Sequence, residues 1–249
     1  ADPASAVDGF VHYQRKEWTL AEADYKRAIN GRVVDSNAFS WYSQMLGAVG
    51  RLRTAREVAL AGTVVNPDST VVNSRVAMAY TWLNDTARAD EYFSRASDLD
   101  ATGIIHDLAY ALYLIRTGQL ELSRNVAYSA AKTLDASTDW IDPLYRALAD
   151  PAYAEEALAA IDQSWAAKDV LPHVVFLGRA MLGDVDGALE IAWLLEEPGE
   201  TFSMELLYID ELAAMRQHPD FMRLLESLGV TAYWQDAGCY WENDRVHCD

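Results

Sequence analysis

Small and apolar positions recur along the first half of this chain with a period of 34 residues. A small residue is followed by an apolar or larger one four positions later and by another small one three positions after that. The three columns are Ala21, Ala55, Ala89 and Ser123; Tyr25, Ala59, Phe93 and Ala127; and Ala28, Gly62, Ala96 and Ala130. This spacing is typical of stacked helix-turn-helix pairs, in which small residues allow two helix backbones to approach closely.

Each repeat is predicted to hold two helices joined by a short turn. The turn residue lies five positions before the first small column and is Lys16, Gly50, Asn84 or Gly118. Glycine and asparagine tolerate the left-handed conformation that ends a helix, so Lys16 is the weakest of these turns. The predicted helices cover residues 5–16 and 20–30, 37–49 and 54–65, 71–83 and 87–99, and 104–116 and 120–134.

The period loosens after Asp135, although the chain still reads as helical. Helices are expected at residues 142–149, 151–167, 172–183, 186–195, 202–216 and 220–228, and the aromatic sequence from residue 233 to 249 is expected to cap the open end. We therefore predict an all-α fold: four repeats over residues 1–136, continued by degenerate repeats and a helical C-terminal capping segment over 137–249. The two parts should form one continuous solenoid.

Charge is distributed unevenly along the chain. The formal net charge is −18, and residues 139–249 hold 22 acidic and 6 basic side chains, a net of −16 that leaves −2 for the first 138 residues. An acidic surface repels nucleic acid and anionic membranes, so neither is an expected partner of this chain. The charge serves either solubility alone or attraction of a cationic partner or ligand.

Neither a membrane span nor a signal peptide is evident in this sequence. It has no run of 18 or more apolar residues, and its start lacks a basic segment followed by an apolar one. We expect it to be one domain of a longer protein.

With the repeats aligned, the chain resembles the tetratricopeptide repeat family between about residues 5 and 136. That family has small residues at repeat positions eight, twenty and twenty-seven, and position eight is Gly9, Ser43, Ala77 and Ala111 here. Its proline near position thirty-two survives only as Pro67, and its frequent tryptophan at position four is absent. The resemblance implies an α-solenoid of helix pairs that binds a protein or peptide partner.

The C-terminal part is similar to a narrower group. Residues 216–221 read Arg-Gln-His-Pro-Asp-Phe, followed by Leu224-Leu225, Leu228-Gly229, Tyr233-Trp234 and Cys248. This pattern resembles the repeat domains attached to bacterial winged-helix regulators of the CadC type and to some class III adenylate cyclases. The resemblance implies a regulatory or sensory domain, with DNA binding or cyclase chemistry in an N-terminal module that this sequence does not include.

The sequence offers no motif for catalysis. Its five histidines are scattered, without a partner at zinc-like spacing, and it has no phosphate-binding glycine loop and no nucleophile elbow. We therefore predict that the domain is not an enzyme, has no metal site and needs no cofactor.

The two cysteines, Cys239 and Cys248, are nine positions apart near the end of the chain. In a reducing compartment they would remain thiols, whereas outside the cytoplasm we expect a disulfide. Together with the family resemblance, they favour a periplasmic or extracytoplasmic location, with a cytoplasmic one as the alternative.

The concave face of such a solenoid, lined by the first helix of each pair, is the predicted partner-binding groove. Its expected lining is Phe10, Tyr13, Asn37, Ser40, Gln44, Ser74 and Met78. An alternative is that Leu108 and Leu112 lie beneath the C-terminal helices, so that the protein fills part of its own groove.

Two functions are compatible with these patterns. The first is a regulatory interaction domain of a bacterial signalling or transcription-regulatory protein, which binds a partner or self-associates through the groove. The second is a sensor of a cationic, polyamine-like small molecule that uses the acidic C-terminal half.

Overall fold

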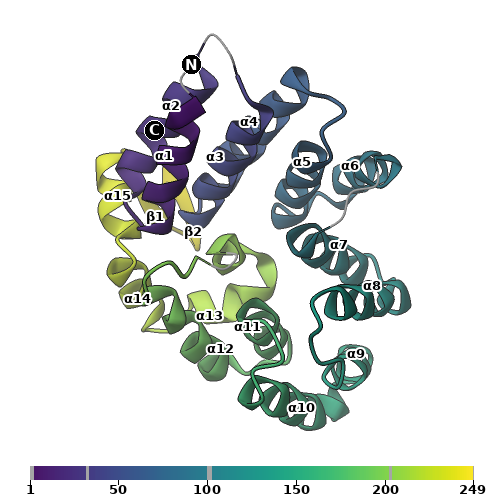
Figure 1. Cartoon of the computed structure of the whole chain (residues 1–249). Coiled ribbons are helices and arrows are strands. Elements are labelled where there is room, and N and C mark those ends of the chain that lie inside the picture. The colour runs from purple at the N-terminus through teal and green to yellow at the C-terminus, as the bar shows by residue number, and fades with distance from the viewer. Residues whose placement is uncertain (1–2, 32–33, 100–102, 202–203, 249) are drawn as a thin grey trace.

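The computed structural model describes residues 3–31, 34–99, 103–201 and 204–248, and these parts are almost entirely helical. The predicted all-α solenoid is confirmed. Its first half consists of consecutive antiparallel helix pairs: α1 (Pro3–Gln14) with α2 (Trp18–Ile29), α3 (Ser36–Ala48) with α4 (Leu52–Val65), α5 (Thr70–Trp82) with α6 (Thr86–Asp98), and α7 (Ile104–Arg116) with α8 (Leu120–Thr133). Figure 1 shows these pairs following one another along a curved path.

The turns inside the pairs lie where the sequence predicted them. Lys16, Gly50, Asn84 and Gly118 all have positive φ angles, of 58°, 79°, 58° and 76°. Even the lysine adopts the left-handed conformation, which shows that the repeat geometry overrides its residue preference at this position.

The small columns of the repeat are buried between helices, except at Ala130, which is half-buried. Ala21 and Ala89 are fully buried, and a Cβ atom added to Gly62 would lie 2.9 Å from the Cβ of Phe39. Ser123, which replaces alanine in the fourth repeat, is also fully buried, and its hydroxyl donates to the carbonyl of Ala111. The 34-residue pattern therefore reflects the small residues that close helix packing requires.

The second half continues with α9 (Ile141–Ala149), η1 (Pro151–Tyr153), α10 (Ala154–Ala166), α11 (Pro172–Met181), α12 (Val185–Ala192) and η2 (Trp193–Glu196). The single helix predicted over residues 202–216 is wrong, and its expected first residue, Phe202, lies outside the described residues. The segment instead forms η3 (Met204–Tyr208), η4 (Asp210–Leu212) and α13 (Ala213–Arg216).

The break in this segment has a packing reason. Four consecutive residues, 204–207, are buried, so η3 has no side that faces solvent and does not behave as an amphipathic surface helix. The guanidinium of Arg216 donates to the carbonyls of Leu207 and Ile209, which supplies hydrogen bonds that a continuous helix would have formed within itself.

The end of the chain contains α14 (Phe221–Ser227), α15 (Val230–Asp236) and a hairpin of β1 (Cys239–Glu242) and β2 (Arg245–Cys248). The expected capping segment is thus only partly helical. Asn243 and Asp244 link the strands with φ angles of 50° and 63°, as a tight hairpin turn requires. The register pairs Cys239 with Cys248, and a disulfide joins them.

This C-terminal segment returns to the start of the chain and makes the solenoid a nearly closed ring, in which α15 packs against α2 (Figure 1). Two buried indoles hydrogen-bond the first repeats to the C-terminal segment. The Nε1 of Trp18 donates to the carbonyl of Leu228, and the Nε1 of Trp234 donates to the carbonyl of Val49, both at 2.8 Å. The segment therefore caps the first two repeats as well as the end of the solenoid.

Candidate binding surfaces

The middle of the concave face is filled by the chain itself. Segment η3 packs against α3 and α5, and a Cβ atom added to Gly47 of α3 would lie 3.1 Å from the Cβ of Glu205. The Glu205 carboxylate pairs with the Arg75 guanidinium of α5 at 3.1 Å, and both side chains are buried. One alternative from the sequence is that the protein fills part of its own groove. The structure shows such filling, but the segment that lies in the groove is η3 and not the expected C-terminal helices.

Three of the predicted groove residues are not accessible. Tyr13, Ser40 and Met78 are exposed to 1%, 3% and 2% of their surface. The hydroxyl of Tyr13 donates to the carbonyl of Thr201 at 3.4 Å, and burial, the largest cause, raises the pKa of this phenol. Their expected role in contacting a partner is therefore corrected, because the segment around η3 covers the face on which they lie.

The other four predicted residues are half-buried. Phe10 of α1 contacts the indole of Trp41 with ring centroids 5.5 Å apart, and Asn37 and Gln44 lie on the same helix, α3, as Trp41. Ser74 of α5 bonds the Nδ1 of His106 at 2.9 Å.

Two positions of the inner face are more accessible in the first two repeats than in the third. The equivalent residues Val7, Trp41 and Arg75 are exposed, half-buried and buried, and at the second position Phe10 and Gln44 are half-buried whereas Met78 is buried. What remains open is the part lined by the first two helix pairs, which we call the N-terminal inner surface: Val7, Phe10, Asn37, Trp41 and Gln44.

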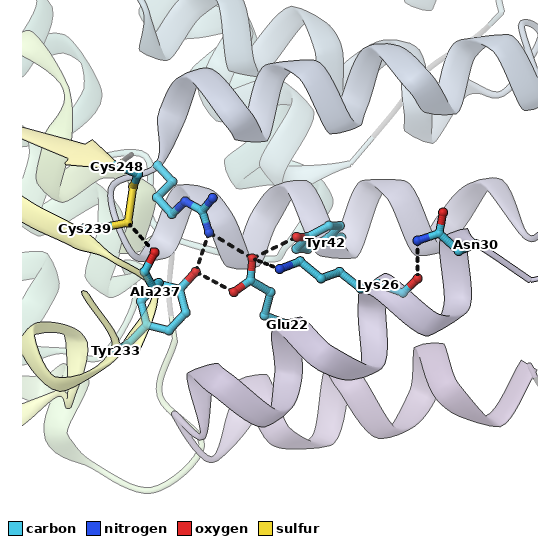
Figure 2. A network of polar contacts seen from close by, with 9 residues as sticks. Glu22, Lys26, Asn30, Tyr42, Tyr233, Ala237, Cys239 and Cys248 are labelled. Carbon is cyan, nitrogen blue, oxygen red and sulfur yellow. Dashed lines mark hydrogen bonds and ion pairs between the residues drawn. A yellow bond between two sulfur atoms is a disulfide. The ribbon is translucent and has the colours of Figure 1, made fainter. Parts of the chain in front are cut away.

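A polar network joins this part of the solenoid to the C-terminal cap (Figure 2). The Glu22 carboxylate accepts hydrogen bonds from Tyr42, Arg51 and Tyr233 at 2.9–3.0 Å, and Lys26 pairs with it at 3.1 Å. Burial alone would raise the pKa of Glu22, but these hydrogen bonds and cationic neighbours outweigh burial and lower the pKa. The network links α2, α3, the start of α4 and α15, and so fixes the first repeats against the cap.

A second opening lies between α7, α8, α9 and α11 and is a pocket of ≈ 90 Å³. Leu108, half-buried, and Leu112, exposed to 1%, line it from α7, opposite Leu144 of α9 and Leu177 of α11. The Nε2 of His173 is buried in the pocket wall without a hydrogen-bond partner among the described residues. Burial lowers the pKa of this imidazole to about 4, so it is uncharged at neutral pH.

Within the parts of the chain that the structure describes, no cluster of three or more His, Cys, Asp or Glu side chains could hold a metal ion. None of the described helices is both long enough and apolar enough to cross a bilayer.

Comparison with known proteins identifies the fold. No family model matches the sequence, and no curated protein matches it. A solved structure, a tetratricopeptide repeat protein from Parabacteroides merdae, is similar with a TM-score of 0.57 over 92% of this chain and 86% of that one, at 14% sequence identity. At this identity the similarity establishes a tetratricopeptide-like fold and leaves similarity to CadC-type regulators or adenylate cyclases a resemblance in sequence pattern.

Proposed function

We propose that this chain is a non-enzymatic interaction domain of a bacterial signalling or transcription-regulatory protein, and that a protein partner binds its N-terminal inner surface. The observation that carries the proposal is that two inner-face positions are accessible in the first two repeats and buried in the third. Phe10, Trp41 and Gln44 are half-buried, whereas their equivalents in the third pair, Met78 and Arg75, are buried, and Arg75 is paired with Glu205 of η3.

The composition of this surface suits a peptide or a helix from a partner. Phe10 and Trp41 are adjacent aromatic side chains, the type that anchors interfaces, and Asn37 and Gln44 can bind backbone groups on either side of them. The Glu22 network and η3 hold the underlying helices in place, so little ordering cost should accompany binding.

The proposal includes an oxidising compartment, in keeping with the disulfide between Cys239 and Cys248. Thiol labelling of denatured protein, isolated from its own cells without reductant, tests this part. Blocked thiols support a periplasmic or extracytoplasmic location, and two free thiols would move the domain to the cytoplasm.

Site-specific photo-crosslinking in the native host tests the partner site. A benzophenone side chain at Asn37 should give one discrete adduct, and the same group at Glu57, exposed on α4, serves as the control. Trp41→Ala should abolish the Asn37 adduct while leaving the circular dichroism spectrum unchanged. An adduct of twice the chain mass would identify self-association, and identical adducts at both positions would refute the assigned surface.

A cationic ligand held by the acidic half finds less support. Acidic side chains of that half, Glu156, Asp162, Asp184, Glu205 and Glu211, pair with arginines of the same chain. These five of the 22 acidic side chains are held by pairing within the chain, and we do not extend the proposal to a polyamine.

A further inference from the structure

We propose that the pocket between α7, α8, α9 and α11 is a binding site for a small uncharged molecule with an aliphatic body of about five carbon atoms and one hydroxyl group. This inference does not rest on the proposed partner surface, which lies on the first two helix pairs.

The pocket exists because the regular packing of the solenoid is interrupted. Helix α3 packs against α5 and α5 against α7, but α7 has no comparable packing against either α9 or α11 within the described residues. The interruption coincides with the loss of the 34-residue period after Asp135. The face of α8 that borders the gap carries the small residues Ala127, Ala130 and Ala131, which leave space unfilled.

Size and lining define the body of the ligand. A volume of ≈ 90 Å³ lies between that of a single water and the roughly 150 Å³ cavity that accepts benzene, so a chain of about five carbons fits with its end at the open side. Nearly all lining side chains are aliphatic or aromatic, among them Leu112, Trp140 and Leu177. Such a wall favours an apolar body.

The head group follows from His173. Its side chain is exposed to 9% and its Nε2 has no partner among the described residues, so a ligand that bonds this nitrogen would remove the cost of an unsatisfied buried polar atom. The uncharged imidazole either donates or accepts at Nε2, depending on its tautomer. A hydroxyl group can do both and therefore fits either tautomer.

The remaining polar groups argue against a charged ligand. Asp107, Tyr145 and His173 are the ionisable residues of the pocket lining, and the Tyr145 hydroxyl is already bonded to Ser123 at 2.6 Å. No lysine or arginine of the described chain lines the pocket to receive a carboxylate. Asp107 is only half-buried, so its carboxylate still reaches water, and an ammonium group would have to give up its own hydration to enter this apolar pocket.

The test compares pentan-1-ol, pentylamine and pentanoate as ligands in NMR titrations of the whole chain. NMR detects the weak binding that is expected of ligands with six or seven non-hydrogen atoms. The indole signal of Trp140, assigned by its loss in Trp140→Phe, reports on the pocket wall. We expect a saturable shift with pentan-1-ol, and neither of the charged probes should bind as tightly.

Two variants locate the site. Ala130→Leu should abolish binding by filling the pocket, whereas Ala159→Leu, exposed on α10, makes the same change elsewhere and should have no effect. His173→Leu should raise the Kd of pentan-1-ol by roughly 3- to 10-fold through loss of one hydrogen bond. The proposal is overturned if pentan-1-ol gives no saturable shift, if pentylamine binds as tightly, or if His173→Leu leaves the Kd unchanged in a folded protein.

Discussion

The buried ion pair between Arg75 and Glu205 makes a sharp test of how the concave face is closed. The two side chains are exposed to only 8% and 2%, come from positions 130 residues apart, and meet at 3.1 Å. Glu205→Gln keeps the size of the side chain and removes its charge, which leaves the Arg75 guanidinium buried without a counter-ion.

The size of the effect follows from the geometry. At 3.1 Å and an effective dielectric constant of about 20, the attraction between the two charges is ~5 kcal/mol, and removing one partner of a buried pair typically costs ~3–5 kcal/mol. For a chain of this length, such a loss lowers Tm by about 10 °C.

Urea unfolding and calorimetry of single and double variants separate the charge from the packing. We expect Glu205→Gln and Arg75→Met each to destabilise the protein strongly, and the double variant with Glu205→Leu and Arg75→Met to recover much of the loss, because no unpaired charge remains. If both single variants cost less than ~1 kcal/mol, η3 is held by apolar contacts alone, and the assigned role of the pair is wrong.

Three further predictions address the cap and the pocket. Reducing the bond between Cys239 and Cys248, which encloses a short loop, should lower the free energy of unfolding by ~2–3 kcal/mol; a control with both residues changed to alanine should no longer respond to reductant. Gly50→Ala should lower the free energy of unfolding by ~2–4 kcal/mol, because φ is +79° and the new Cβ would lie 2.6 Å from a side-chain atom of β2. Gly118→Ala is the control: φ is +76° and nothing lies within 4 Å of the new Cβ, so it should cost only ~1–2 kcal/mol. Equal losses in the two variants would contradict the packing argument. Burial lowers the pKa of His173 from 6.5 to about 4, so the unfolded chain binds the proton more readily, and the free energy of unfolding should fall by up to ~3 kcal/mol as the pH drops from 6.5 to 4. Urea unfolding of His173→Gln should show a smaller fall over the same pH range. An identical pH profile in this variant would contradict the burial of a neutral imidazole.

Much of the repeat architecture could be predicted from the sequence because it depends on local features. The small columns and the turn residues make contacts within one or two helix pairs, so the period of 34 residues is enough to locate them. Gly50 and Gly118 mark their turns because their φ angles are positive, and Lys16 shows that the period identifies a turn even where the residue type does not.

The candidate surfaces depended on contacts that the sequence does not encode locally. Tyr13 and Met78 occupy the repeat positions of an open groove, but the segment around η3, more than a hundred residues later, covers them. The apolar spacing of residues 204–216 suits a helix, but the sequence does not show that this segment is buried against α3 and α5 and divided into η3, η4 and α13. His173 likewise became a candidate only because its Nε2 in the irregular second half has no partner among the residues that the structure describes.

Closure of the ring changes how this solenoid should unfold. Repeats in an open solenoid contact only their neighbours, so their stabilities are nearly independent, and end repeats fray first. Here Trp18 and Trp234 bond backbone carbonyls about 200 positions away in the chain, and Tyr233 joins the Glu22 network, so the first repeats and the cap stabilise one another. We therefore expect hydrogen exchange in α2 and α15 to show one common opening free energy. Trp234→Ala, which removes one fastening and leaves a cavity, should lower protection in both helices together, whereas loss of protection in α15 alone would show that the ring is not a cooperative unit.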